Sequence, residues 1–100
     1  IRFGTALIEH KLLDAKHTEI LLTPKATRNN GDYAYGFYVR NINGARSVGH
    51  GGGAPGMNGD LYVFPESGYV VAALTNLDPP TAQRMAAFVA SRVQTGGSTP

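Results

Sequence analysis

The 100-residue sequence contains no cysteine, and charged residues account for only 16% of it. Without cysteine the chain forms no disulfide and uses no thiol nucleophile, although this absence names no cellular compartment. No apolar run approaches the roughly 20 residues that a membrane-spanning helix needs. The longest strongly apolar segment is Val70–Leu74, while hydrophobic residues make up 42% of the chain. This composition predicts a globular chain without a membrane span.

Neither positive nor negative charge predominates in the sequence. Nine lysine and arginine residues stand against seven aspartate and glutamate residues, which gives a formal net charge of +2. The basic residues are scattered along the chain, whereas a nucleic-acid interface needs them gathered into a stripe or patch. The three histidines, His10, His17 and His50, form no metal-binding motif. We therefore expect no nucleic-acid partner and no metal site.

The length fits one domain or a piece of one, and we take residues 1–100 as a single partial domain. Apolar residues at helical spacing begin at once, as if the start of a helix lay upstream. This helix is expected over residues 2–11, and a second over residues 14–22 with Asp14 as its N-cap. The polar composition of residues 25–32 predicts a loop.

After this loop the apolar pattern changes from helical to alternating. Aromatic and β-branched residues predict four strands, over residues 35–40, 46–51, 59–64 and 69–74. Asn43-Gly44 predicts a hairpin turn between the first two strands. The glycine-rich segment between the second and third strands predicts a wide bend. Asp78-Pro79 predicts the start of a C-terminal helix, with the aspartate as the cap.

The expected fold class is α+β, with a four-stranded antiparallel β-meander, N-terminal helical segments and a C-terminal helix packed on the sheet. The buried face of that last helix is expected to comprise Ala82, Met85, Ala86, Val89 and Val93. The last strand, over Val70–Leu74, leaves a sheet edge exposed in this arrangement. An exposed edge favours pairing with another chain.

The stretch SVGHGGGAPG, residues 47–56, places five of the thirteen glycines around His50. It matches the G-x-G-x-x-G pattern of dinucleotide sites, but that pattern needs a following helix and a strand is expected here. It also matches the His-Gly-Gly-Gly oxyanion motif of lipase-type hydrolases, but no G-x-S-x-G nucleophile follows. On the residues alone, a bend with an incidental histidine and a site that uses the imidazole both stay open.

A combined order of motifs resembles one family. Its parts are Tyr35-Gly36-Phe37, Gly49–Gly56, Pro65-Glu66 and Val70–Asn76. This order is similar to the C-terminal part of the serine β-lactamase and penicillin-binding-protein-like hydrolases. The branch in question includes class C β-lactamases, D-alanyl-D-alanine carboxypeptidases, D-aminopeptidases and family VIII esterases. The resemblance covers nearly the whole chain.

The resemblance implies a role for the glycine-rich stretch. The third active-site motif of this family is Lys-Thr-Gly or His-x-Gly on a strand beside the cleft, which corresponds to His50-Gly51-Gly52. His50 is then a catalytic residue, and Gly51 and Gly52 bind substrate. The backbone N–H of Gly53 is one of two oxyanion-hole donors. No cofactor is implied, and the substrate is a small acyl compound. A histidine in place of lysine favours an esterase or peptidase over a β-lactamase.

The other two motifs of the family are missing from this chain. No serine is followed three residues later by lysine, and no tyrosine is followed two residues later by asparagine or serine. The resemblance therefore implies a fragment that is inactive alone. Its expected partner is the remainder of the hydrolase chain, which carries the nucleophile, or a second copy of itself through the exposed sheet edge. The alternative is a non-catalytic, self-associating β-sheet module.

Overall fold

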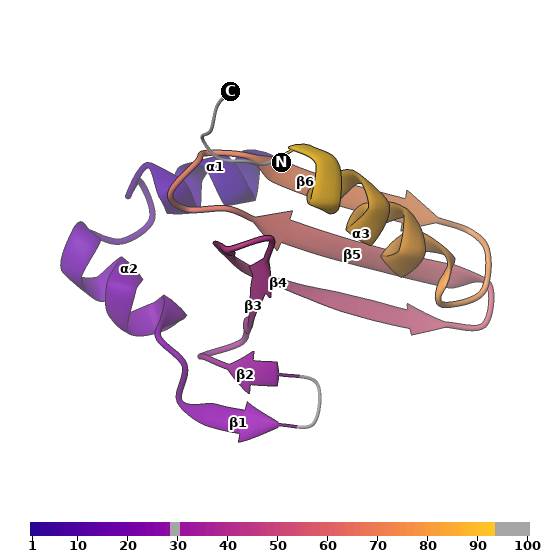
Figure 1. Cartoon of the computed structure of the whole chain (residues 1–100), viewed down its shortest axis with the longest axis horizontal. Helices are drawn as coiled ribbons and strands as arrows, with labels where there is room; N and C mark the ends of the chain where they lie inside the picture. Colours follow the sequence, from indigo (N-terminus) through magenta and orange to yellow (C-terminus); the bar gives the residue numbers. More distant parts are fainter. Residues whose placement is uncertain (29–30, 94–100) are drawn as a thin grey trace.

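The computed structural model describes residues 1–28 and 31–93, which form three helices and six strands. The helices are α1 (Arg2–Ile8), α2 (Ala15–Leu22) and α3 (Thr81–Val93). The strands are β1 (Ala26–Arg28), β2 (Gly31–Tyr33), β3 (Tyr38–Ile42), β4 (Ala45–Ala54), β5 (Met57–Val63) and β6 (Val70–Thr75). Every strand pairs antiparallel with its neighbour in the sequence, so the sheet is a meander in the order β1-β2-β3-β4-β5-β6 (Figure 1).

The α+β class and the antiparallel meander are confirmed, but the predicted number of four strands is wrong. The two additional strands, β1 and β2, lie where residues 25–32 predicted a loop. Each has three residues, and they pair through backbone contacts such as Ala26 opposite Tyr33. Strands this short carry too few residues for an alternating apolar pattern, so their polar composition resembles that of a loop. The first helix also ends earlier than predicted, at Ile8.

The wide bend predicted for the glycine-rich stretch is also wrong. Strand β4 has ten residues and includes Gly51, Gly52 and Gly53, and the chain reverses only at the two residues that follow Ala54. Gly56 in that turn has a φ of +80°, which glycine adopts without strain. The hairpin turn predicted at Asn43-Gly44 is confirmed, with φ values of 54° and 90°.

The two faces of the sheet have separate cores. On one face, Leu7 of α1 and Leu22 of α2 pack with Val48 and Val63 of the sheet. On the other face, Tyr62 and Phe64 pack with alanines of α3. The predicted position of the C-terminal helix on the sheet is therefore confirmed (Figure 1). None of the helices in residues 1–28 and 31–93 has the length and apolar character needed to cross a membrane.

The buried face of α3 agrees with the predicted one at Ala82 and Ala86, whereas Val89 and Val93 are half-buried and Met85 is exposed. Ala82, Ala86 and Ala90 are each at most 2% exposed, whereas Met85 is 58% exposed and Phe88 56% exposed. The alanines share one face because they are four residues apart, and their small side chains let the helix lie close to the strands. Met85 was therefore placed wrongly on the buried face, since hydrophobicity alone does not distinguish a close-packed alanine face from a neighbouring stripe of larger residues.

The predicted cap of α3 is also wrong. The side chain of Asp78 accepts a hydrogen bond from the backbone N–H of Gly56, 2.6 Å away, rather than from the helix. The first amides of α3 donate to the side chain of Asn58 on β5 instead, with Ala82 N at 2.7 Å and Gln83 N at 3.4 Å from Oδ1. An acceptor 24 positions away in the sequence satisfies amides that no residue of the helix satisfies.

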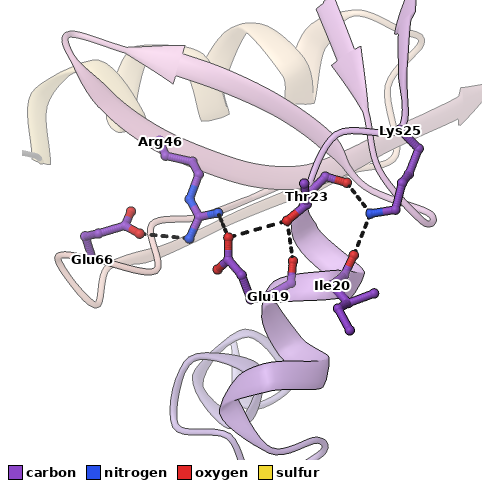
Figure 2. Close-up of polar contacts among 6 residues, drawn as sticks. All are labelled: Glu19, Ile20, Thr23, Lys25, Arg46 and Glu66. Atoms are coloured by element: carbon purple, nitrogen blue, oxygen red, sulfur yellow. Dashed lines mark hydrogen bonds and ion pairs between the residues drawn. The ribbon is translucent and has the colours of Figure 1, made fainter.

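Helix α2 begins as predicted. The carboxylate of Asp14 accepts a hydrogen bond of 2.8 Å from the backbone N–H of His17, and this bond lowers the pKa of Asp14. Arg46 on β4 then connects the helix to the sheet, because its guanidinium lies 3.4 Å from Glu19 on α2 and 2.8 Å from Glu66 after β5 (Figure 2). Burial lowers the pKa of Arg46, but the two carboxylates outweigh burial and raise it.

Candidate functional site

The four residues singled out by the resemblance are consecutive on β4, just beyond the end of its pairing with β3. The last pair between these strands is Tyr38 opposite Gly49, whereas pairing with β5 continues to Ala54 opposite Met57. In residues 1–28 and 31–93, no strand pairs with the segment 50–54 on the side away from β5. Alternate backbone groups of this segment point to that open edge, where an extended ligand can bind.

His50 is exposed to solvent but held by contacts on both sides of its ring. Nδ1 lies 2.6 Å from the carbonyl oxygen of Gly51, and Nε2 lies 3.2 Å from the hydroxyl oxygen of Tyr33. The ring centroids of Tyr38 and Tyr33 lie 4.9 Å and 5.8 Å from that of the imidazole. The histidine is therefore positioned by three strands, β2, β3 and β4.

Gly49 and Gly53 occupy positions where a side chain does not fit. A Cβ at Gly49 would overlap the carbonyl oxygen of Leu61 on the neighbouring strand. A Cβ at Gly53 would lie 2.6 Å from Cγ of Pro79. At Gly52, by contrast, a Cβ would meet no atom within 4 Å. The backbone of the strand is thus packed closely at residues 49 and 53 and is open at residue 52.

Asn58 fixes the position of residues 50–54 of β4, which we call the glycine strand, relative to α3. Its side chain is buried, with the residue 4% exposed, and its Nδ2 donates a hydrogen bond of 2.9 Å to the carbonyl oxygen of Gly52. Its Oδ1 accepts from the first amides of α3, as described above. One side chain therefore satisfies both the strand and the helix.

A partly buried ion pair between β3 and β5 lies on the face of the sheet that α3 covers. Arg40 Nη2 is 3.7 Å from Oδ1 of Asp60, and the guanidinium stacks over the ring of Tyr62, 4.4 Å from its centroid. Burial raises the pKa of Asp60, and the positive charge of Arg40 opposes that rise. A Cβ at Gly51 would lie 3.0 Å from this carboxylate, so the absence of a side chain at Gly51 leaves room for Asp60.

An open hollow lies on the sheet beside Gly52 and Gly53. Its volume is about 330 Å³, and it is lined by Gly52, Gly53, Ala54, Met57, Asn58, Gly59, Leu74 and Thr75. The largest side chains here are the most exposed, with Leu74 at 87% and Met57 at 59%. The apolar surface next to the glycine strand is thus unpartnered in the part of the chain that the structure describes.

Sequence reasoning identified the strand of the site but missed its supporting side chains. Tyr33 and Tyr38 enclose the imidazole, and Asn58 connects the strand to α3. Tyr33 belongs to the short strand β2, which composition did not reveal. Asn58 had a signal, because it stands two residues before Asp60 and four before Tyr62, in phase with side chains that face α3.

Metal ligands are not gathered at this site. Among the described residues, no three histidine, aspartate or glutamate side chains lie close enough to hold a metal ion. The groups that are present are an imidazole, phenol hydroxyls, backbone amides and an ion pair. These groups are suited to hydrogen bonding and proton transfer.

Comparison with known proteins bears on this geometry. The family model described as Beta-lactamase matches residues 1–94 of the chain. A search of curated proteins finds no match.

Proposed function

Because the chain belongs to the β-lactamase family, we propose that it is the C-terminal part of a serine hydrolase that cleaves an amide or ester bond. In this proposal the acyl group is transferred to a serine outside residues 1–100 and is then released by water. The chain contributes one wall of the cleft. His50 assists the reaction from this wall, Gly51 and Gly52 line the bound substrate, and the N–H of Gly53 stabilises the oxyanion.

The open edge of β4 is the observation that carries the proposal. Pairing with β3 stops at Gly49, and the strand continues for five more residues with one edge free among the described residues. A segment composed mainly of glycine lets an acyl group approach the backbone closely. His50 is the first residue of this free edge, and this position supports a role beside the substrate.

The hollow beside Gly52 is an argument for a partner that supplies the nucleophile. Leu74 and Met57 expose apolar surface directly next to the proposed oxyanion donor. We assign this surface to the remainder of the hydrolase chain, because the serine must lie within reach of the Gly53 amide. The isolated chain is then inactive, since it contains neither Ser-x-x-Lys nor Tyr-x-Asn.

Complementation tests this proposal. The chain is combined with a segment of the same family that carries Ser-x-x-Lys, and hydrolysis of a chromogenic ester and of a cephalosporin is measured. We expect activity only in the mixture, with the ester preferred. Full activity on both substrates in a His50→Ala variant would contradict the role of His50.

The Gly53 amide has its own test, because a side chain at that position would strike Pro79. Replacing the amide N–H of Gly53 by an ester oxygen removes the donor and adds no atom. We expect a loss of about 100-fold to 1,000-fold in kcat. The same replacement at Gly52 is the control and should cost much less. Equal losses at both positions would refute the assignment.

A second candidate function is a non-catalytic module that associates through its sheet. The observation that favours it is the position of β6 at the end of the strand order, with Leu74 87% exposed. Sedimentation over a range of concentrations distinguishes the two candidates. A second copy as partner predicts a dimer that dissociates in an Ala72→Lys variant, whereas a monomer with complete secondary structure argues against edge pairing.

A further inference from the structure

The contacts of His50 determine which ring nitrogen carries its proton. The carbonyl oxygen of Gly51 is an acceptor only, so Nδ1, 2.6 Å away, must be the donor. In a neutral imidazole the other nitrogen is then an acceptor. The Tyr33 hydroxyl, 3.2 Å from Nε2, must therefore donate to it.

We propose that Tyr33 is a positioning residue of this site, which together with the Gly51 carbonyl holds His50 in the Nδ1-protonated tautomer. Its role in hydrolysis depends on the function proposed above, but the tautomer does not. The pairing of the sheet supports the arrangement. Tyr33 lies opposite Tyr38 across β2 and β3, and Tyr38 lies opposite Gly49, the residue before His50.

The same geometry defines where a proton is accepted. When the imidazole takes up a second proton from solvent, both ring nitrogens are donors, and the Tyr33 oxygen changes from donor to acceptor by rotation of its O–H. His50 thus gains a proton without losing its partner. The rings of Tyr33 and Tyr38 pack edge to face, 4.9 Å apart, and keep the phenol in place during this change.

Nuclear magnetic resonance of the imidazole nitrogens in the full 100-residue chain tests the proposal. The chain is labelled with ¹⁵N-histidine and measured near pH 8.5, about two units above the ordinary pKa of histidine. We expect His50 to show a protonated Nδ1 and an unprotonated Nε2, the reverse of the tautomer that predominates in free histidine. A protonated Nε2 in the wild-type chain would overturn the proposal. Variants at His10 and His17 assign the signals.

Tyr33→Phe removes the hydroxyl and keeps the ring. Since an acceptor nitrogen loses its hydrogen bond, its ¹⁵N signal should move downfield toward that of a free imidazole nitrogen. Tyr38→Phe is the matched control, because Tyr38 contacts the imidazole through its ring, and it should leave the Nε2 signal in place. An unchanged Nε2 signal in Tyr33→Phe, or an equal shift in both variants, would contradict the proposal. If Tyr33→Phe does not fold, the wild-type tautomer alone decides.

The complemented hydrolase gives a second readout. There we expect Tyr33→Phe to lower kcat about fivefold to tenfold, the size of one hydrogen bond, with KM unchanged. An effect on KM alone would contradict a role through His50. If His50→Ala leaves hydrolysis intact while Tyr33→Phe still moves the Nε2 signal, the proposed function fails and the positioning of His50 stands.

Discussion

The two faces of the sheet hold their helices in different ways. Helix α3 lies on a buried row of alanines, and its first amides are satisfied by the buried Asn58. Helix α2 packs on the sheet through Leu22, and its polar connection to the sheet is Arg46, whose carboxylate partners are more than 60% exposed. A buried hydrogen bond is costly to leave unmade, whereas an exposed ion pair contributes little. The glycine strand is attached to the more firmly held helix, and the following variants test that difference.

The largest effect is expected at Gly49, where the strand tolerates no side chain. Gly49→Ala places a methyl group against the carbonyl oxygen of Leu61 and forces the two strands apart. We expect the free energy of unfolding to fall by about 3 kcal/mol or more, measured by urea denaturation. Gly52→Ala is the matched control, because its methyl group meets no atom within 4 Å, and it should change stability by less than about 1 kcal/mol. Similar losses in the two variants would argue against close packing at Gly49.

The next largest effect is expected for Asn58→Ala. This variant removes the Asn58 donor from the partly buried hydrogen bond to the Gly52 carbonyl and leaves the buried Ala82 amide without its acceptor. The expected loss is about 2–3 kcal/mol in the free energy of unfolding. Asn76→Ala, at an exposed position, is the control and should be nearly neutral. A loss below about 1 kcal/mol would mean that water replaces the Asn58 side chain.

A smaller effect is expected for Arg46→Met, which removes the charge and keeps most of the apolar stem. Its ion pairs with Glu19 and Glu66 are exposed, so the expected loss is about 0.5–1 kcal/mol at low salt. The loss should shrink when thermal unfolding is repeated at about 1 M salt, because salt screens exposed charges. Lys16→Met on α2, the helix that carries Glu19, is the comparison variant. A loss that is independent of salt would indicate packing rather than charge.

The smallest effect concerns the cap of α2 and depends on pH. The pKa of Asp14 is lowered in the folded chain by its hydrogen bonds with His17. The ionised cap therefore adds stability above the unfolded pKa of about 3.9, and this contribution disappears as the pH falls through the lower folded value. Asp14→Asn keeps a capping oxygen that does not titrate. Unfolding measured from pH 5 down to pH 2 should show the wild-type advantage vanish, and an advantage that grows toward low pH would contradict this assignment.

The sequence predicted those parts of the fold that depend on local pattern. The cap at Asp14, the turn at Asn43-Gly44 and the position of the last helix on the sheet are confirmed. The strand character of Gly52 and Gly53 was not predicted, because glycine has a low intrinsic preference for strands. These residues are nevertheless held in a strand by pairing with β5.

Only part of the candidate site could be predicted, because a sequence motif identifies neighbours in the chain and not contacts between strands. The residues of β4 are neighbours in the sequence, so a motif could identify them. Tyr33 and Asn58 reach the same place from other strands, and their contacts depend on strand register. The register across β1 and β2 cannot be predicted from the sequence, because each strand has only three residues and carries no apolar alternation. Side chains that act through such long-range pairing become visible only in the folded chain.

Asn58 also has a consequence for motion. Its amide binds the carbonyl of Gly52 on β4 and the first amides of α3, so separation of β4 from β5 breaks the hydrogen bond that orients the side chain capping the helix. The amides of Ala82 and of β4 should therefore exchange with solvent deuterium as one cooperative unit. The short hairpin of β1 and β2 lies at the other end of the sheet and should exchange earlier. Because Tyr33 belongs to that hairpin, opening of the hairpin would release the imidazole of His50 while residues 50–54 of β4 stay in place.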